Sequence, residues 1–362
     1  MSQPHAPLPL WSVAWPLAGW ALLGVSLLGP LGIWWALLLA VALVGTVLSA
    51  VHHAEVVAHK VGEPYGTLVL ALAITVIEVA LIVSMMLAGG PETTALARDT
   101  VFAAVMLILN GIVGLCLLVG GSRYREQTFG QLGVSASLTT LAAIAALTLV
   151  LPNYTTTTPG PMYSPSQLAF VAVVSLVLYG TFVLVQTVRH RDYFLPPEAT
   201  TDEDAHAAPP QGKLAAASAG LLLLALVAVV LMAKALAPTI EGAVASAGAP
   251  KAVVGIIIAM VVLLPEGLAA FRAARANRLQ TSLNLALGSA LASIGLTIPA
   301  VAIVSLATGW TLTLGLDIKS SVLLLLSLFV STLSLSTGRT TVLQGTVHLV
   351  LLATYLFTTI VP

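Results

Sequence analysis

Long apolar runs dominate the chain, and charged residues are confined to short stretches between them. No Asp, Glu, Lys or Arg occurs in residues 1–54 or in residues 127–188. Runs of this length are typical of helices that cross a membrane. Membrane-spanning β-strands need only about ten alternating residues, so the pattern favours helices over a barrel. Breaks at charges, Gly and Pro separate eleven predicted helices, near 11–29, 31–57, 65–89, 99–121, 131–151, 166–188, 214–237, 252–272, 280–308, 319–336 and 341–361.

Composition supports a membrane protein and excludes other classes. Hydrophobic residues make up 58% of the 362 residues, charged residues only 8%, and the mean hydropathy is +1.03. A soluble domain carries about 25% charged residues, because its surface faces water. The balance of 14 basic and 14 acidic residues excludes a nucleic-acid-binding protein, which would show a basic excess. The single cysteine, Cys116, excludes a disulfide framework and a thiolate metal site.

The basic residues between the predicted helices indicate an orientation. Ten Lys and Arg residues lie in the connections that follow even-numbered helices, and four lie in those that follow odd-numbered helices. Because cytoplasmic loops carry the excess of Lys and Arg, the even-numbered connections should be cytoplasmic. This places the N-terminus inside and the C-terminus outside. No Lys or Arg precedes the first apolar run, so we expect no cleaved signal peptide.

One polar segment divides the chain. Residues 189–213 contain four prolines and five acidic residues, with too few apolar residues to form a core. The segment predicts a flexible cytoplasmic linker. We therefore expect a leading helix in 1–30, a five-helix half in 31–188, the linker in 189–213 and a second five-helix half in 214–362.

Two acidic residues lie inside predicted helices. Glu78 and Glu266 each follow the preceding charged residue by 15 positions, which is roughly 22 Å of helix and reaches the middle of a bilayer core about 30 Å thick. A carboxylate at that depth costs several kcal/mol unless it pairs, is protonated or faces a cavity, so it indicates function. The structural alternative is a protonated Glu that hydrogen-bonds across a helix interface.

The spacing of these acids also bears on topology. Glu78 is predicted on the third helix and Glu266 on the eighth, so the two helices cross the membrane in opposite directions, as in an inverted repeat. The helix after each acid carries small polar residues, Asn110 in the first half and Ser289 and Ser293 in the second. Oxygen ligands beside two carboxylates suit a hard cation such as Ca²⁺ or Na⁺. The same Ser and Asn residues are also common in helix packing.

The segment GEPYGTLVLALAITVIE, which ends at Glu78, resembles the first α-repeat of the cation/proton exchangers in the Ca²⁺/cation antiporter superfamily. The segments HHAEVVAHKVGEPYGTLVLALA and LPEGLAAFRAARANRLQTSLNLALGSALASIGLTIP resemble the ChaA-type bacterial antiporters of calcium, sodium or potassium and protons. Wider relatives place Gly-Asn shortly before each glutamate, where this chain has Ile74-Thr75 and Val262-Leu263.

The resemblance implies an all-α membrane fold of eleven transmembrane helices, with one leading helix and two inverted five-helix repeats, in the bacterial inner membrane. It implies a cation site between the α-repeats, with Glu78 and Glu266 as the essential glutamates. Asn110, Ser289 and Ser293 match the polar groups of the following helices, and Thr75 can add a hydroxyl.

Four further polar residues gather near the predicted cytoplasmic end of the second helix. His52, Glu55 and His59 share a helix face, and Glu63 begins the next helix, where it could line a vestibule. The functional interpretation is a pH sensor or proton relay, because His titrates near physiological pH. The alternative is a group of interfacial residues that marks a helix end.

The function predicted from these observations is secondary cation/proton antiport by alternating access, with export of Ca²⁺, or of Na⁺ or K⁺. The expected partners are inorganic cations, protons and the lipid bilayer, with no cofactor and no nucleic acid. One Ca²⁺, two protons, or one monovalent ion with one proton would each neutralise two buried carboxylates, and only neutral states should cross readily. The alternatives are a cation channel and an intramembrane metal-dependent enzyme.

Overall fold

The computed structural model describes residues 8–26, 32–62, 65–89, 93–195 and 212–361. The helices form two compact units. Unit 1 comprises Met1–Ala88 and Thr201–Ala247, and unit 2 comprises Gly89–Thr200 and Gly248–Pro362. Each unit therefore combines segments that are far apart in the sequence.

In the described residues, eight helices are long and apolar enough to cross a membrane, and three further apolar helices are shorter. The eight are Ile33–Val61, Leu96–Tyr124, Gln131–Tyr154, Pro165–Arg189, Gly212–Ser246, Ala252–Arg275, Leu279–Thr308 and Val342–Ile360. The three shorter ones are Leu10–Ser26, Leu72–Met86 and Ile318–Ser334. The prediction of an all-α multi-pass membrane protein is confirmed. The count of eleven crossings stays a prediction.

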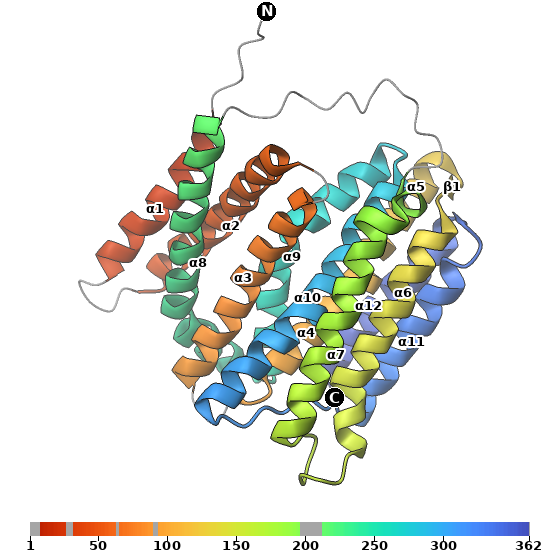
Figure 1. The fold of residues 1–362 in the computed structure, drawn as a ribbon. Helices are drawn as coiled ribbons and strands as arrows, with labels where there is room; N and C mark the ends of the chain where they lie inside the picture. Colours follow the sequence, from red (N-terminus) through yellow and green to blue (C-terminus); the bar gives the residue numbers. More distant parts are fainter. Residues whose placement is uncertain (1–7, 27–31, 63–64, 90–92, 196–211, 362) are drawn as a thin grey trace, which may run out of the picture. The chain divides into compact units, whose positions relative to one another are not determined.

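Unit 1 contains α1 (Leu10–Ser26), α2 (Ile33–Val61), α3 (Tyr65–Gly89) and α8 (Gly212–Ser246) (Figure 1). Helix α2 packs against both α1 and α8. Buried hydroxyl groups join the first two helices, because Ser49 Oγ donates to the Ser12 carbonyl over 2.5 Å and Thr46 Oγ1 donates to the Trp15 carbonyl over 3.2 Å. Such hydrogen bonds stabilise helix pairs where lipid provides no hydrophobic driving force.

Helix α8 is longer than its apolar pattern predicted. The sequence placed its end near residue 237, but the helix continues through Pro238 to Ser246. Proline removes one backbone hydrogen bond, which a long membrane helix tolerates when neighbouring groups compensate. Glu241 is therefore an exposed residue of a helix and not part of a loop.

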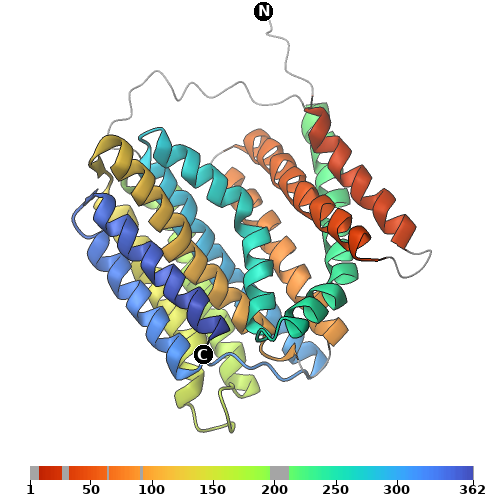
Figure 2. The same cartoon turned by 180° about the vertical axis from the view of Figure 1, so that it is seen from behind.

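Unit 2 contains the remaining elements. They are α4 (Leu96–Met106), η2 (Leu107–Ile112), α5 (Val113–Tyr124), β1 (Gln127–Thr128), α6 (Gln131–Ala145), η3 (Ala146–Val150), η4 (Leu151–Tyr154), α7 (Pro165–Leu184), η5 (Val185–Arg189), η6 (Arg191–Phe194), α9 (Ala252–Arg275), α10 (Leu279–Thr308), α11 (Ile318–Ser334), β2 (Arg339–Thr340) and α12 (Val342–Ile360). Helix α10 packs against α4, α6, α7 and α9. Figure 2 shows α12, in dark blue, beside the gold span formed by α4, η2 and α5.

Local sequence signals fix several helix boundaries in unit 2. Ser164 before α7 and Thr341 before α12 each form a capping box with the Gln three residues later. Asp317 caps α11 by accepting a hydrogen bond from the Ser320 N–H.

In the π-helical turn η3, the Leu147 carbonyl accepts a 2.5 Å hydrogen bond from the Tyr163 hydroxyl. Burial raises the pKa of Tyr163 to about 12, so this hydroxyl remains a donor at neutral pH.

The connections of unit 2 gather into two groups, one at each end of its helices. At one end, β1 pairs antiparallel with β2, and Gln127 Nε2 donates to Asn277 Oδ1 over 2.9 Å. At the other end, Met162 forms a β-bridge with Thr313. The first group joins connections that follow even-numbered predicted helices, and the second joins connections that follow odd-numbered ones.

Many large apolar side chains face outward. Phe170 on α7 is 68% exposed, Phe329 on α11 is 61% exposed and Phe357 on α12 is 64% exposed. A soluble monomer rarely exposes apolar surface on this scale. These faces are suited to contact with lipid.

The start of the predicted linker is ordered. Residues Arg191–Phe194 form η6, and Phe194 is buried against Phe182, with ring centroids 5.9 Å apart. The Phe194 carbonyl accepts a 2.6 Å hydrogen bond from Asn284 Nδ2. Residues 196–211, which hold the prolines and most acids of the linker, lie outside the described residues.

Candidate functional site

The predicted acid of the second half lies in the interior of unit 2. Glu266 is 9% exposed, in the middle of α9, a helix that packs against α10 and against the η2 turn. The preceding residue, Pro265, has no N–H, so α9 lacks the usual hydrogen bond from residue 265 to the Val261 carbonyl. The sequence therefore places Glu266 directly after a proline that interrupts the backbone hydrogen bonding of α9.

The predicted serines occupy the neighbouring helix α10. Ser293 is buried at 4% exposure, and Ser289, one turn earlier, is half-buried. Because α9 and α10 pack against each other, Glu266 and the two serines come from adjacent helices of one unit. Their hydroxyl groups are neutral oxygens of the kind that a hard cation accepts.

Asn110 lies in the π-helical turn η2 and is fully buried. Its Nδ2 donates to Ser327 Oγ on α11 over 2.8 Å, and its Oδ1 lies 3.3 Å from His348 Nδ1 on α12. With Nδ2 donating to Ser327, Oδ1 is the amide oxygen that faces His348 Nδ1. Contacts between Asn110 and the neighbouring helices α11 and α12 are expected if Asn110 serves helix packing. The role as a cation ligand stays a prediction.

The predicted acid of the first half lies in unit 1. Glu78 is 3% exposed on α3, and Thr75 is 5% exposed one turn earlier. Residues three apart share a face of a helix, so the Thr75 hydroxyl accompanies the Glu78 carboxylate. Both acids that the sequence singled out are therefore buried side chains of apolar helices, one in each unit.

The polar residues near the end of α2 differ in how far they are buried. His52 is half-buried, with its ring 5.2 Å from that of Trp11, whereas Glu55 and His59 are exposed. The fully buried histidine is His53, whose Nε2 lies 2.9 Å from the Ser12 carbonyl of α1. Glu63 lies outside the described residues. The role of this group stays a prediction.

The sequence analysis missed two members of the Asn110 network, Ser327 and His348. Both are fully buried. His348 could have been noticed as the only histidine in the last predicted helix. Ser327 gave no such signal, because serine is common in membrane helices. In the parts of the chain that the structure describes, no group of three or more His, Cys, Asp and Glu side chains is placed to hold a metal ion.

Comparison with known proteins identifies the family. The family described as sodium/calcium exchanger protein matches residues 31–188 and 217–361. The chain belongs to this family. The match covers both predicted halves and confirms the resemblance to the Ca²⁺/cation antiporter superfamily. The chain is accordingly a transporter and not an enzyme.

Individual relatives match most of the chain. It is 49% identical to the ionic transporter-like protein y4hA of Sinorhizobium fredii. The match extends over 360 residues and covers 99% of this chain and 98% of y4hA. It is 37% identical over 324 residues to the sodium-potassium/proton antiporter ChaA of Escherichia coli, covering 89% of this chain and 87% of ChaA. Among solved structures, native YfkE matches with a TM-score of 0.74 at 18% identity, covering 97% of this chain and all of YfkE. That likeness shows a shared fold.

Proposed function

We propose that this transporter is an antiporter that exchanges a cation for protons, with Glu78 and Glu266 as the groups that bind both. The observation that carries the proposal is a buried glutamate in an apolar helix of each unit, in a chain that belongs to an exchanger family. The 37%-identical ChaA is a sodium-potassium/proton antiporter, and a 26%-identical protein of Aphanothece halophytica is a Ca²⁺/H⁺ antiporter. The cations under test are therefore Na⁺, K⁺ and Ca²⁺.

The coupling follows from charge. Two ionised carboxylates inside a membrane are costly, so a transporter with neither ion bound should not change its direction of access. Two protons neutralise both carboxylates, as does one Ca²⁺, or one monovalent ion together with one proton. When only neutral states interconvert, each outward movement of a cation requires an inward movement of protons. An inward proton-motive force then drives cation export.

Neutral oxygens complete the proposed ligand set. They come from Thr75 beside Glu78, and from Ser289, Ser293 and Asn110 in the unit that holds Glu266. Oxygen atoms from hydroxyl and amide groups suit Na⁺, K⁺ and Ca²⁺ rather than soft metals. His52, Glu55, His59 and Glu63 are proposed to lie on the proton or cation route at the cytoplasmic end of α2.

We further propose eleven crossings, formed by one leading helix and two inverted five-helix repeats that the linker 189–213 joins. The grouping of connections in unit 2 supports the alternation of the helices. Eight arginines belong to the end where β1 pairs with β2, whereas the Met162–Thr313 end has Arg98, Lys251 and Lys319. By the positive-inside rule, the arginine-rich end is cytoplasmic. The N-terminus would then be inside and the C-terminus outside a bacterial inner membrane.

The test uses amide variants of the buried acids in proteoliposomes. Glu78→Gln and Glu266→Gln keep the side-chain shape but remove the negative charge, so each should abolish cation-driven proton movement, measured with an enclosed pH dye. Glu241→Gln is the matched control, because Glu241 is an exposed acid on α8 and should leave exchange near normal. Near-normal exchange by either buried-acid variant at matched protein amount would contradict the proposal. Repeating the assay with Na⁺, K⁺ and Ca²⁺ separately gives the ion preference.

A further inference from the structure

The fully buried histidine of α12, His348, has no part in the proposed ligand set. Its ring lies against the π-helical turn η2, with Nδ1 3.3 Å from Asn110 Oδ1, and it also interacts with the Leu109 carbonyl of the same turn. The second ring nitrogen, Nε2, is buried and has no hydrogen-bond partner among the described residues. A buried polar atom without a partner is uncommon and calls for an explanation.

Glycines bring α12 close to the span that carries Asn110. Gly345, three residues before His348, lies against the backbone of Leu118 on α5. At Gly114 of α5, an added Cβ would lie 2.9 Å from the Cβ of His348, which is closer than real side chains come. Small residues of this kind let membrane helices approach closely. The close approach of the two backbones therefore fixes the histidine beside η2.

The Asn110 amide is held on both sides. Nδ2 donates to Ser327 Oγ over 2.8 Å, and Oδ1 faces His348 Nδ1. Ser327 Oγ itself donates to the Leu323 carbonyl over 2.7 Å, so it offers Asn110 a lone pair and not a proton. A cation needs the amide oxygen, whereas a rotated amide would present its NH₂ group. The two contacts disfavour that rotation, and the second lone pair of Oδ1 stays available for a cation.

His348 brings no charge to this place. In the described residues it forms no ion pair, and an unpaired imidazolium inside a membrane is costly, so the ring is neutral. A neutral ring adds no third exchangeable charge to the two glutamates. Leucine would fill similar space without leaving a buried nitrogen unpaired, so packing alone does not account for a histidine here. The contact between Nδ1 and the turn η2 does.

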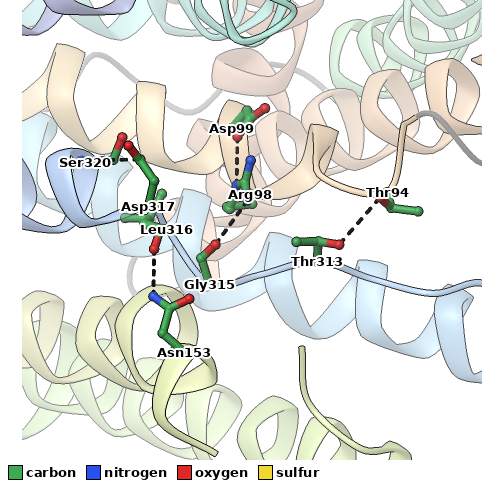
Figure 3. A network of polar contacts seen from close by, with 9 residues as sticks. All are labelled: Thr94, Arg98, Asp99, Asn153, Thr313, Gly315, Leu316, Asp317 and Ser320. Carbon is green, nitrogen blue, oxygen red and sulfur yellow. Dashed lines mark hydrogen bonds and ion pairs between the residues drawn. The ribbon is translucent and has the colours of Figure 1, made fainter. Parts of the chain in front are cut away.

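The loop cluster drawn in Figure 3 provides a structural comparison within the same unit. There Asn153 Nδ2 donates to the Leu316 carbonyl over 2.6 Å, and Arg98 donates to the Gly315 carbonyl over 3.0 Å. Both bonds tie a helical segment to the loop before α11. No member of the proposed ligand set belongs to this cluster. Asn153 therefore represents an asparagine whose hydrogen bond serves structure only.

We propose that His348 is a positioning residue for Asn110, which keeps the amide oxygen available as a ligand and so sets the affinity for the cation. The inference deepens the proposed function and rests on it for the role of Asn110 as a ligand. Loss of the ring removes no carboxylate. It should therefore weaken binding of the cation and leave the maximal rate of exchange largely unchanged.

The experiment measures the half-saturation concentration and the maximal rate in proteoliposomes, with Na⁺, K⁺ and Ca²⁺ in turn. His348→Leu removes both ring nitrogens and should raise the half-saturation concentration about tenfold, as expected for loss of a buried polar contact. The maximal rate should stay within about twofold. Asn153→Ala is the structural control and should leave the half-saturation concentration unchanged, although it removes a 2.6 Å hydrogen bond.

A double variant tests whether His348 acts through Asn110. In a chain that carries Asn110→Ala, His348→Leu should have little further effect on the half-saturation concentration, because the group that it positions is gone. Strict additivity of the two changes would contradict the proposal. An unchanged half-saturation concentration in His348→Leu alone, or an equal rise in Asn153→Ala, would do the same.

Two amide variants separate the ring nitrogens. The side-chain amide of Asn lies at the position of Nδ1, and that of Gln lies at the position of Nε2. His348→Asn should therefore keep the half-saturation concentration near that of the unmodified chain, and His348→Gln should raise it. Equal values for the two variants would refute the role of Nδ1. This comparison decides the proposal even if His348→Leu does not fold or Asn110→Ala is inactive.

The two proposals fail separately. If Glu78→Gln and Glu266→Gln leave exchange intact, the proposed function is wrong, and the His348 variants still show whether this ring sets cation affinity. If the glutamate variants lose exchange while His348→Leu and His348→Gln keep the normal half-saturation concentration, only the positioning role is wrong.

Discussion

Replacing Ser327 with alanine should destabilise unit 2, because it removes the acceptor of a buried amide. Ser327 Oγ accepts a 2.8 Å hydrogen bond from Asn110 and donates to the Leu323 carbonyl within its own helix over 2.7 Å. Loss of the hydrogen bond to Leu323 should cost little, since the Leu323 carbonyl keeps its backbone partner in the helix. Loss of the hydrogen bond from Asn110 should cost more, because the Asn110 amide is fully buried. The other acceptor near Asn110 Nδ2 is the weak acceptor Met106 Sδ at 3.8 Å.

The expected size of the effect comes from the cost of an unmade buried hydrogen bond. That cost is about 1–3 kcal/mol in general, and interhelical hydrogen bonds in membranes average about 0.6 kcal/mol with a maximum near 1.7. We expect Ser327→Ala to lower the free energy of unfolding by about 1–1.5 kcal/mol. In a chain that already carries Asn110→Ala, the same change should cost only a few tenths of a kcal/mol, because the donor is gone.

Ser331 provides the matched control. It lies one turn further along α11 and is equally buried, but its Oγ has no hydrogen-bond partner among the described residues. Ser331→Ala should therefore change stability by less than about 0.5 kcal/mol. The measurement is equilibrium unfolding in mixed detergent and dodecyl sulfate micelles, followed by far-ultraviolet circular dichroism. Equal effects of the two serine changes, or strict additivity of Ser327→Ala with Asn110→Ala, would refute the assigned network.

Two further predictions concern transport and orientation. If cation and protons compete for Glu78 and Glu266, lowering the pH should raise the half-saturation concentration for the cation and change the maximal rate less, because bound protons must leave first. Uptake into inverted vesicles over a range of pH tests this, and a constant half-saturation value would count against shared carboxylates. A cysteine at position 205 should react with impermeant reagents only from the cytoplasm, and one at position 157 only from outside. Cys116 is 1% exposed, so the unmodified chain should stay unlabelled, and reversed labelling would overturn the orientation.

The positions of the helices could be predicted from the sequence, because in a membrane each apolar segment forms its helix without help from distant parts of the chain. A backbone inside lipid must satisfy its own hydrogen bonds, so every apolar run of sufficient length becomes a helix. The predicted run 280–308 corresponds to α10 at Leu279–Thr308, and 65–89 coincides with α3. Glu78 and Glu266 were found for a related reason, since a charged residue inside such a run is conspicuous. Membership of the exchanger family could also be predicted, because the matching motifs are contiguous stretches of the chain. By contrast, the end of α8 was misplaced, because Pro238 stops most helices but is tolerated in this one.

Only the tertiary structure decided which polar residues meet. Asn110 contacts Ser327 and His348, which lie 217 and 238 positions away in the chain. In a soluble helix the apolar stripe shows which face is buried. In these helices the lipid-facing and protein-facing sides are both apolar, so sequence periodicity does not distinguish them. The partners of a serine, asparagine or tyrosine are therefore set by how the helices pack, and that information is not present in any single segment of the chain.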